Sequence, residues 1–331
     1  MKVFANVEYL CTMKVCRFLP ILLVIILFQS CGLETAKPFN KQFVILASDC
    51  LLPKDSTLFS AFSHSSGIKV RILHLTSEQI RSRLNKEGIE TEIDALLLSS
   101  SYDAIQMEST NLFQKIPLDS FPTDLNTKYR SHRQMLAGLG YDPYVIIRRK
   151  EAPTVKNYAS LLNSDGYCTD LSELSDMAPF YLFLHHKHSG NDANSADAWI
   201  EDLSSKCNKK LSEKDTLIYA QLLFTKRSHF LKKKKNTFIS YRDGELIFPN
   251  QRIGGSYYDM PSMGIVKQAR NYTNALELLR FLTSKQGNRG LNKRLQTISF
   301  FTDSRSVRFK RFHTSPLRME KFIPNILQSI D

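Results

Sequence analysis

Residues 43–98 read FVILASDCLLPKDSTLFSAFSHSSGIKVRILHLTSEQIRSRLNKEGIETEIDALLL. Three patterns of strand length lie at the beginning, middle and end of this segment: apolar runs at 43–47 and 93–98, and at 68–72 an alternation of Ile68, Val70 and Ile72 with charged residues. The first and last runs are apolar at almost every position, which is typical of strands that are buried on both faces. The segment therefore predicts a sheet that is covered by helices on both sides.

The two connections between these runs have helical patterns. From Ser56 apolar residues recur three and four positions apart until Gly67, and from Ser77 a second such pattern runs until Gly88. A strand, helix, strand, helix, strand order with buried strands predicts an α/β fold with a parallel sheet.

Polar residues follow the first and third predicted strands. In open α/β sheets ligands bind beyond the carboxyl ends of the strands. We therefore expect a ligand to contact Asp49 after the first strand and Ser100, Ser101 and Tyr102 after the third.

A targeting segment precedes the predicted sheet. Lys14 and Arg17 provide positive charge, Phe18–Phe28 is apolar, and small residues surround Cys31. The apolar run is shorter than the roughly 20 residues of a membrane-spanning helix. We therefore predict a signal peptide over residues 1–30 that is removed, and we favour it over an uncleaved membrane anchor.

The cysteine that follows this run resembles the lipidated cysteine of a bacterial lipobox. The resemblance implies that the mature protein begins at a lipid-modified Cys31, with residues 31–42 as a tether and with translation starting at Met13. It also implies an exported protein that is anchored to a bacterial membrane, in the periplasm or at the cell surface.

The formal net charge of +13 raises the question of an anionic partner. An exported, lipid-anchored protein does not routinely meet nucleic acid, so we expect no nucleic-acid partner and favour anionic lipid, polysaccharide or ligand. Outside the signal peptide and the lipidation position, the cysteines are Cys50, Cys168 and Cys207. At most one disulfide bridge forms among them, and the candidate partners of Cys168 are Cys50 and Cys207.

The rest of the chain predicts shorter elements. Strands are expected at 144–147, 238–241, 245–248 and 263–266, and helical stretches at 158–163, 180–186, 196–203 and 216–224. Asn274, with Glu277 three positions later, is expected to cap a further helix.

A set of short segments occurs in a fixed order between residues 43 and 303. The set comprises Leu58–Phe62, Ser66–Val70, Arg83–Gly88, Ile93–Leu98, Gly138–Tyr141, His185-His186, Ala198-Trp199, Phe248–Gln251, Gly264–Asn271 and Ala275–Leu282. Together these segments resemble the bacterial iron(III)-type periplasmic solute-binding proteins that serve ABC transporters.

This resemblance implies two α/β lobes, each with a mainly parallel sheet flanked by helices, joined by crossing strands. Ligand would be held in the cleft between the lobes, which close on binding. Lobe 1 would comprise residues 43–138 and 252–300, and lobe 2 residues 139–251 and 301–331. The implied partners are an ABC permease and its ATPase, and the protein is expected to act as a monomer.

The ligands by which this family binds iron are not matched here. The family holds ferric ion through two adjacent tyrosines, often with a Tyr or His after the first strand and an arginine near the crossing. The corresponding places read Ser48-Asp-Cys50 after the first strand, Tyr141-Asp-Pro-Tyr144 at the crossing, and lysine-rich sequence over 225–236 where the tyrosine pair is sought. The ferric site as the family builds it is therefore expected to be absent.

An adjacent tyrosine pair does occur elsewhere, in Tyr257-Tyr258-Asp259 on the expected return crossing. One hypothesis is a rebuilt ferric site at Tyr257 and Tyr258, which requires a loop, because neighbouring side chains of a strand point to opposite faces. The alternative is that one tyrosine belongs to the core and the other stacks on an organic ligand. With Tyr141, these three residues complete the set of candidate cleft residues.

The sequence thus predicts a lipid-anchored solute-binding protein of an ABC-type uptake system that captures a metal ion or a small anion. No Gly-x-Ser-x-Gly motif is present, and no candidate nucleophile is accompanied by a His and an acid at a familiar spacing. We therefore do not expect the protein to be an enzyme. No cofactor is expected, and ferric ion is the one candidate. The alternative is a surface lipoprotein that retained the fold, lost its ligand and serves in assembly or adhesion.

Overall fold

The structure is a computed structural model. It describes residues 42–117, 129–164, 167–169, 171, 174–188, 198, 201, 222–236, 244–252, 254–302 and 309–324. Several predictions lie outside the described residues: the signal peptide, Cys31, Cys207 and the strand expected at 238–241. Of the helix expected at 196–203, only residues 198 and 201 are described. Among the described residues, no helix combines the length and the apolar character needed to cross a bilayer.

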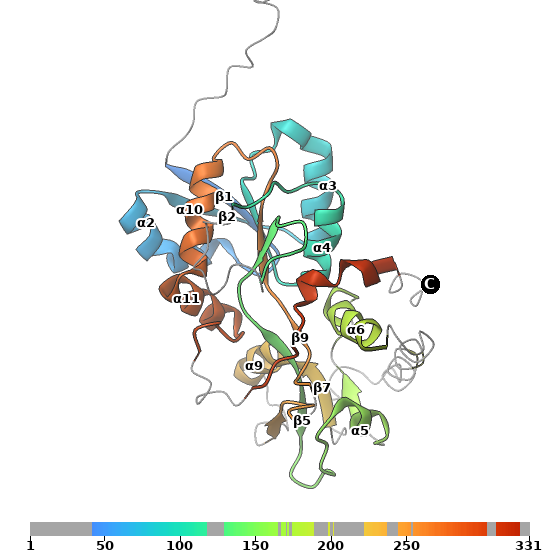
Figure 1. The fold of residues 1–331 in the computed structure, drawn as a ribbon. Coiled ribbons are helices and arrows are strands. Elements are labelled where there is room, and N and C mark those ends of the chain that lie inside the picture. The colour runs from blue at the N-terminus through green and yellow to red at the C-terminus, as the bar shows by residue number, and fades with distance from the viewer. Residues whose placement is uncertain are drawn as a thin grey trace, which may run out of the picture. The chain divides into compact units, whose positions relative to one another are not determined.

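The first sheet has the strand order β2-β1-β3-β10-β4. Its strands β1 and β2 are labelled in Figure 1. Its strands are β1 (Phe43–Ser48), β2 (Lys69–His74), β3 (Ala95–Leu98), β4 (Leu136–Gly138) and β10 (Ser262–Ile265). β1 pairs in parallel with both β2 and β3, as the sequence predicted. β10 enters between β3 and β4 and is antiparallel to both.

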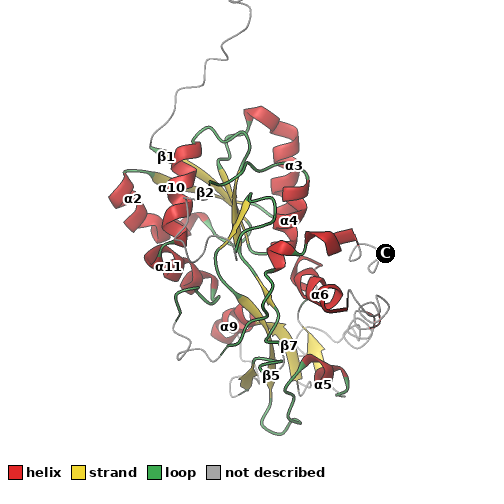
Figure 2. Cartoon of the chain, in the orientation of Figure 1, coloured by secondary structure: helices red, strands yellow, loops and turns green. Residues whose placement is uncertain are grey.

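Helices cover both faces of this sheet because alternate residues of its strands point to opposite sides. Leu96 and Leu98 of β3 pack in the cluster that contains the apolar residues of α3 (Ser77–Glu87) and α4 (Ser101–Ser109). Ala95 and Leu97 pack in a second cluster with α2 (Ser60–Ser66), α10 (Tyr272–Thr283) and α11 (Lys285–Leu295). Figure 2 shows the two groups of helices on either side of the strands.

The helix predicted from Ser56 begins as a 3-10 helix, η1 (Pro53–Phe59), and continues as α2. Gly67 ends it with a φ of 73°, the left-handed conformation that glycine adopts at low cost. α3 begins after Thr76, whose side chain accepts a hydrogen bond from the Gln79 amide, and a short 3-10 helix, η2 (Gly88–Glu90), follows it.

The second sheet has the order β6-β7-β5-β8. Its strands are β5 (Asp142–Arg148), β6 (Tyr167–Thr169), β7 (Leu222–Lys226) and β8 (Glu245–Ile247), and β9 (Tyr258–Asp259) pairs with the start of β5. The flanking helices are α5 (Tyr158–Leu162), α6 (Leu174–His188) and α9 (Arg227–Asn236). β6 and β7 are parallel, whereas β5 is antiparallel to β7, β8 and β9.

The predicted fold class, an α/β fold of two lobes, is confirmed, and three local expectations are corrected. Parallel pairing holds among β1, β2 and β3. The second sheet is mostly antiparallel over its described strands, because β7, β8 and β9 each run in the direction opposite to β5. Residues 222–224, expected to be helical, belong to β7. Asn274 lies inside α10, which starts after Asn271, and its Nδ2 donates to the Phe43 carbonyl instead of capping the helix.

The described C-terminal residues lie along the return crossing. Ser256 forms a parallel bridge with Arg311, and two 3-10 helices follow, η5 (Pro316–Arg318) and η6 (Glu320–Phe322). η5 contacts both α4, which packs on the first sheet, and α6, which flanks the second. This segment therefore joins elements of both sheets.

Candidate functional site

Asp49 lies directly after β1, where the ends of two neighbouring strands meet. Its carboxylate accepts hydrogen bonds from the backbone nitrogen and the hydroxyl of Ser99, both at 2.9 Å, and from the Ser77 hydroxyl at 3.3 Å. Burial raises the pKa of the Asp49 carboxyl, and the hydrogen bonds from Ser99 oppose that rise. The residue expected from the sequence thus organises the carboxyl edge of the first sheet.

Asp103, in the first turn of α4, is a second carboxyl group at this edge. Burial raises its pKa to about 6, and the charges of Asp49 and Asp259 add to the rise. Sequence reasoning missed this residue, although its position two after Ser101 was a usable signal.

The start of α4 is bonded to elements that flank the second sheet. The Ser100 hydroxyl donates to the Ser175 carbonyl of α6 at 2.8 Å. Ser101 donates to Oδ1 of Asp259 from its backbone nitrogen at 2.8 Å and from its hydroxyl at 2.6 Å. Ser100, Ser101 and Asp259, all predicted from the sequence, therefore meet where α4 approaches α6 and β9.

Lys226, at the end of β7, adds a cation to this meeting point. Its Nζ atom lies 2.8 Å from Oδ2 of Asp259 and 2.9 Å from Oδ1 of Asp176, and its side chain is 4% exposed. Burial disfavours the ammonium form, but the charges of Asp259, Asp176 and Asp142 outweigh burial and raise the pKa of Lys226. Nothing in the local sequence singles out this lysine among its many basic neighbours.

Two further groups complete the surroundings of Lys226. Asp142, at the start of β5, accepts hydrogen bonds from the backbone nitrogen and the hydroxyl of Ser228. Nε2 of His229 lies 3.6 Å from Oδ1 of Asp176. The resulting polar cluster, which we call the carboxylate cluster, comprises Asp49, Asp103, Asp142, Asp176, Asp259 and Lys226.

Comparisons with known proteins identify the fold that carries this cluster. Iron uptake protein A1 from Synechocystis sp. strain PCC 6803 is 24% identical over 293 residues, which are 78% of this chain and 77% of that protein. A solved Trichodesmium structure in complex with iron and citrate ligands has a TM-score of 0.73 at 16% identity and covers 87% of this chain and 98% of that chain. Ferric iron-binding protein A of Mannheimia haemolytica, in an open conformation, has a TM-score of 0.75 at 16% identity, with 88% and 98% covered.

The chain has the fold of the iron(III)-type periplasmic solute-binding proteins. The resemblance read from the sequence is thereby confirmed. No protein-family model matches the chain.

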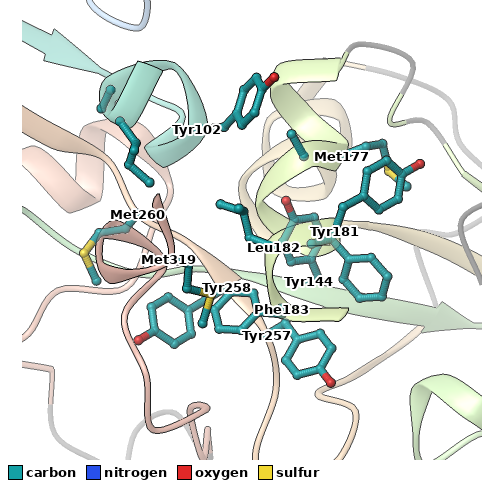
Figure 3. Close-up of a cluster of buried hydrophobic side chains, with 14 of the residues drawn as sticks. Tyr102, Tyr144, Met177, Tyr181, Leu182, Phe183, Tyr257, Tyr258, Met260 and Met319 are labelled. Atoms are coloured by element: carbon teal, nitrogen blue, oxygen red, sulfur yellow. The ribbon is translucent and has the colours of Figure 1, made fainter. Parts of the chain in front are cut away.

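In this solute-binding fold, Tyr257 and Tyr258 are packed among aromatic rings (Figure 3). The Tyr257 ring stacks on Phe183 with a centroid distance of 4.8 Å and an interplanar angle of 2°. The Tyr258 ring meets Tyr141 edge to face at 5.1 Å, and its hydroxyl donates to the Thr314 carbonyl at 3.2 Å. Burial raises the pKa of both phenols above their ordinary value, which favours neutral phenols over the phenolates that bind ferric ion.

The hydroxyl groups of the remaining candidate tyrosines, Tyr102 and Tyr141, also form hydrogen bonds with protein groups. The Tyr102 hydroxyl accepts a hydrogen bond from Nε2 of Gln106 at 2.8 Å. The Tyr141 hydroxyl donates to Tyr129 at 2.6 Å and accepts a hydrogen bond from Arg311. Both side chains are buried, which is the expected behaviour of core tyrosines with a polar tip.

The region in which the family resemblance seeks its tyrosine pair, 225–236, forms the end of β7 and α9. Lys226 and Arg227 stand at this junction. Within the described ranges, no group of three or more His, Cys, Asp or Glu side chains is arranged to hold a metal ion. Cys50 is a free, half-buried thiol beside Asp49.

Proposed function

We propose that this chain is the extracytoplasmic solute-binding protein of an ABC-type uptake system. It captures a small ligand, a metal ion or a small anion, between its two lobes and presents the closed form to a permease and its ATPase. The similarity to iron uptake protein A1 and to ferric-binding structures over most of both chains supports this function. It acts as a binding protein and not as an enzyme.

The single observation that carries the proposal is the carboxylate cluster. Asp49 and Asp103 come from elements of the first sheet, whereas Asp142, Asp176 and Lys226 come from elements of the second. Asp259 lies between these two groups and is bonded to Ser101 and to Lys226. Closure of two lobes around a ligand needs such convergence of polar groups from both sides.

The proposed lobes are residues 43–138 with 252–300 and residues 139–251 with 301–331. The proposed ligand contacts are Asp49, Ser100, Ser101, Tyr102 and Asp259, with Tyr141, Tyr257 and Tyr258 as the apolar and aromatic support behind them. Sheet membership is compatible with this division for β10, which joins the first sheet, and for β8, which joins the second. β9 is the exception, because it lies within residues 252–300 and pairs with β5.

The amino-terminal sequence supports an exported and lipid-anchored form. Residues 1–30 act as the signal peptide in this proposal, and a lipid on Cys31 holds the protein, as a monomer, on a bacterial membrane. Several acyl chains on one cysteine would give stable anchoring, whereas a single chain binds a membrane only marginally.

A ligand panel tests the proposal. Ferric ion, other metal ions, phosphate, citrate and sugars are added separately, and the melting temperature of the protein is recorded. A ligand at 100 to 1,000 times its dissociation constant stabilises the folded state by about 3–4 kcal/mol. One clear stabilising ligand is expected, and its absence across the panel contradicts capture.

A ligand-less surface lipoprotein is the second candidate. It is favoured by the saturation of Asp259, whose Oδ1 accepts from Ser101 and Met260 and whose Oδ2 accepts from Lys226. A protein of this kind would show no stabilising ligand and would retain its membrane location.

A further inference from the structure

The ammonium group of Lys226 occupies a position suited to a bound cation. It lies 2.8 Å from Oδ2 of Asp259 and 2.9 Å from Oδ1 of Asp176, and the charge of Asp142 also acts on it. With 4% of its side chain exposed, Lys226 has little water to offset its charge, so these carboxylates neutralise it.

Carboxylate oxygens also bind hard metal ions, although the acidic side chains of the described residues are not arranged as a metal site in this structure. Large hard cations bind carboxylate oxygens at about 2.3–2.6 Å, so a metal at the Nζ position requires each carboxylate to move inward by only about 0.5 Å. A metal ion and an ammonium group cannot both occupy this position, because two like charges at such close range repel strongly where water is excluded. Entry of a metal therefore requires the ammonium to leave or to lose its proton.

Loss of that proton is unfavourable in this environment. Although burial favours the neutral amine, the surrounding carboxylates raise the pKa of Lys226. Removing the ammonium while keeping the carboxylates leaves buried negative charge without compensation, which is strongly destabilising.

We propose that Lys226 is a specificity-determining residue that excludes metal ions from the carboxylate cluster. This inference rests on the proposed function, in which the cluster contacts the ligand.

Terbium(III) is the probe, because it is a hard trivalent cation whose luminescence is sensitised by nearby tyrosine. Tyr144 provides a local donor, since its hydroxyl donates to the Asp176 carbonyl at 2.6 Å. The full chain in detergent is compared as wild type and as Lys226→Met, which keeps the length of the side chain and removes its charge. The variant is expected to bind terbium(III) at least tenfold more tightly than wild type, with a matching gain for ferric ion supplied as a weak chelate.

Three control variants separate this effect from a general change of charge or structure. Lys285→Met removes the same charge from an exposed position on α11 and is expected to leave terbium binding as in wild type. Lys226→Arg keeps a cation in the cluster and is also expected to exclude the metal. Lys226→Met combined with Asp259→Asn removes one of the two carboxylates that contact Nζ and is expected to abolish the gain.

The inference is overturned if wild type binds terbium(III) or ferric ion as tightly as Lys226→Met does, or if the folded variant gains no affinity. If Lys226→Met is unfolded without metal, restoration of its circular dichroism by terbium(III) supports the inference. Lys226→Gln is the second variant. If both Lys226→Met and Lys226→Gln stay unfolded with and without metal, the wild-type protein decides: tight binding of metal by wild type overturns the inference, and a lack of such binding supports it. Failure of the proposed function is seen separately, as a wild-type protein that no solute stabilises.

Discussion

Ser101 and Asp259 are 158 positions apart in the chain, yet the backbone nitrogen of Ser101 lies 2.8 Å from Oδ1 of Asp259. The carboxylate thereby accepts a hydrogen bond at the amino end of α4, where the helix dipole favours negative charge. Its other oxygen contacts the ammonium of Lys226. One buried aspartate thus connects a helix of the first sheet to a strand of the second.

Substitution of Asp259 is expected to be costly. Asp259→Asn keeps an oxygen for Ser101 but removes the charge that compensates Lys226, and breaking a buried ion pair in this way costs about 3–5 kcal/mol. Urea unfolding measures the change in free energy. Ser101→Ala, which removes one hydroxyl from the same site, should cost only about 1 kcal/mol. Equal losses for the two variants would contradict a compensating role of the charge.

Glu108 gives a pH dependence of stability. It is buried in α4, and burial raises its pKa to about 7, with the Ser131 hydroxyl opposing and the charge of Glu320 adding to the rise. The folded state holds the proton of Glu108 more tightly than the unfolded state does. The contribution of Glu108 to the free energy of unfolding is therefore fully present below pH 4.5 and is lost as the pH rises to about 7. Glu108→Gln should therefore be more stable than wild type at pH 8, by on the order of 2 kcal/mol, and nearly equal to it at pH 4.

The control for this prediction is Glu277→Gln. The Glu277 side chain is 44% exposed and pairs with Arg280 one helical turn away, an arrangement that contributes little to stability. Chemical unfolding at pH 4, 6 and 8 compares the three proteins. A pH profile of Glu108→Gln that parallels wild type would show that Glu108 is not the titrating group.

Gly140 lies between β4 and β5, and a methyl group there has no room. A Cβ atom would lie 1.9 Å from Oδ1 of Asn292, whose Nδ2 donates to the Leu139 carbonyl. Gly140→Ala should therefore displace Asn292 and destabilise the protein by about 1–3 kcal/mol. Gly290→Ala is the matched control in α11, where the nearest side-chain atom is 3.3 Å away and alanine favours the helix. Thermal unfolding should separate the two variants, and a harmless Gly140→Ala would refute the close contact.

Cys31 tests the predicted membrane anchor. Cys31→Ser removes the thiol that would carry the lipid, so the protein is expected to keep an unprocessed amino end or to leave the lipoprotein fraction of the membrane. Labelled palmitate and membrane fractionation measure lipid and location. Substitution of Cys16 within the predicted signal should not remove the lipid. Continued lipid labelling of Cys31→Ser would disprove the assigned position.

The strands and helices of residues 43–98 were predictable because each depends on a local pattern. Apolar runs define β1 and β3, and the spacing that ends at Gly67 and Gly88 defines the limits of the helices between them. The local pattern failed at Asn274, where a plausible cap proved to be an interior residue of α10. It failed also at residues 222–224, whose apolar character fits a buried helix and a buried strand equally well.

The candidate site was predictable only in part. Asp49, Ser100 and Ser101 were candidates because they follow strands of a parallel sheet, where the ends of the strands converge. Asp176 and Lys226 were missed, since no motif distinguishes one lysine or aspartate from its many equivalents along the chain.

The sequence by itself determined the α/β fold and the order of its first elements, because these depend on the types of residues that are near neighbours in the chain. Only the tertiary structure decided that Lys226 meets Asp176 and Asp259. These three side chains come from a strand, a helix and a crossing segment that are distant in sequence. Charges that distant in sequence influence one another only after folding has brought them together and removed the water between them.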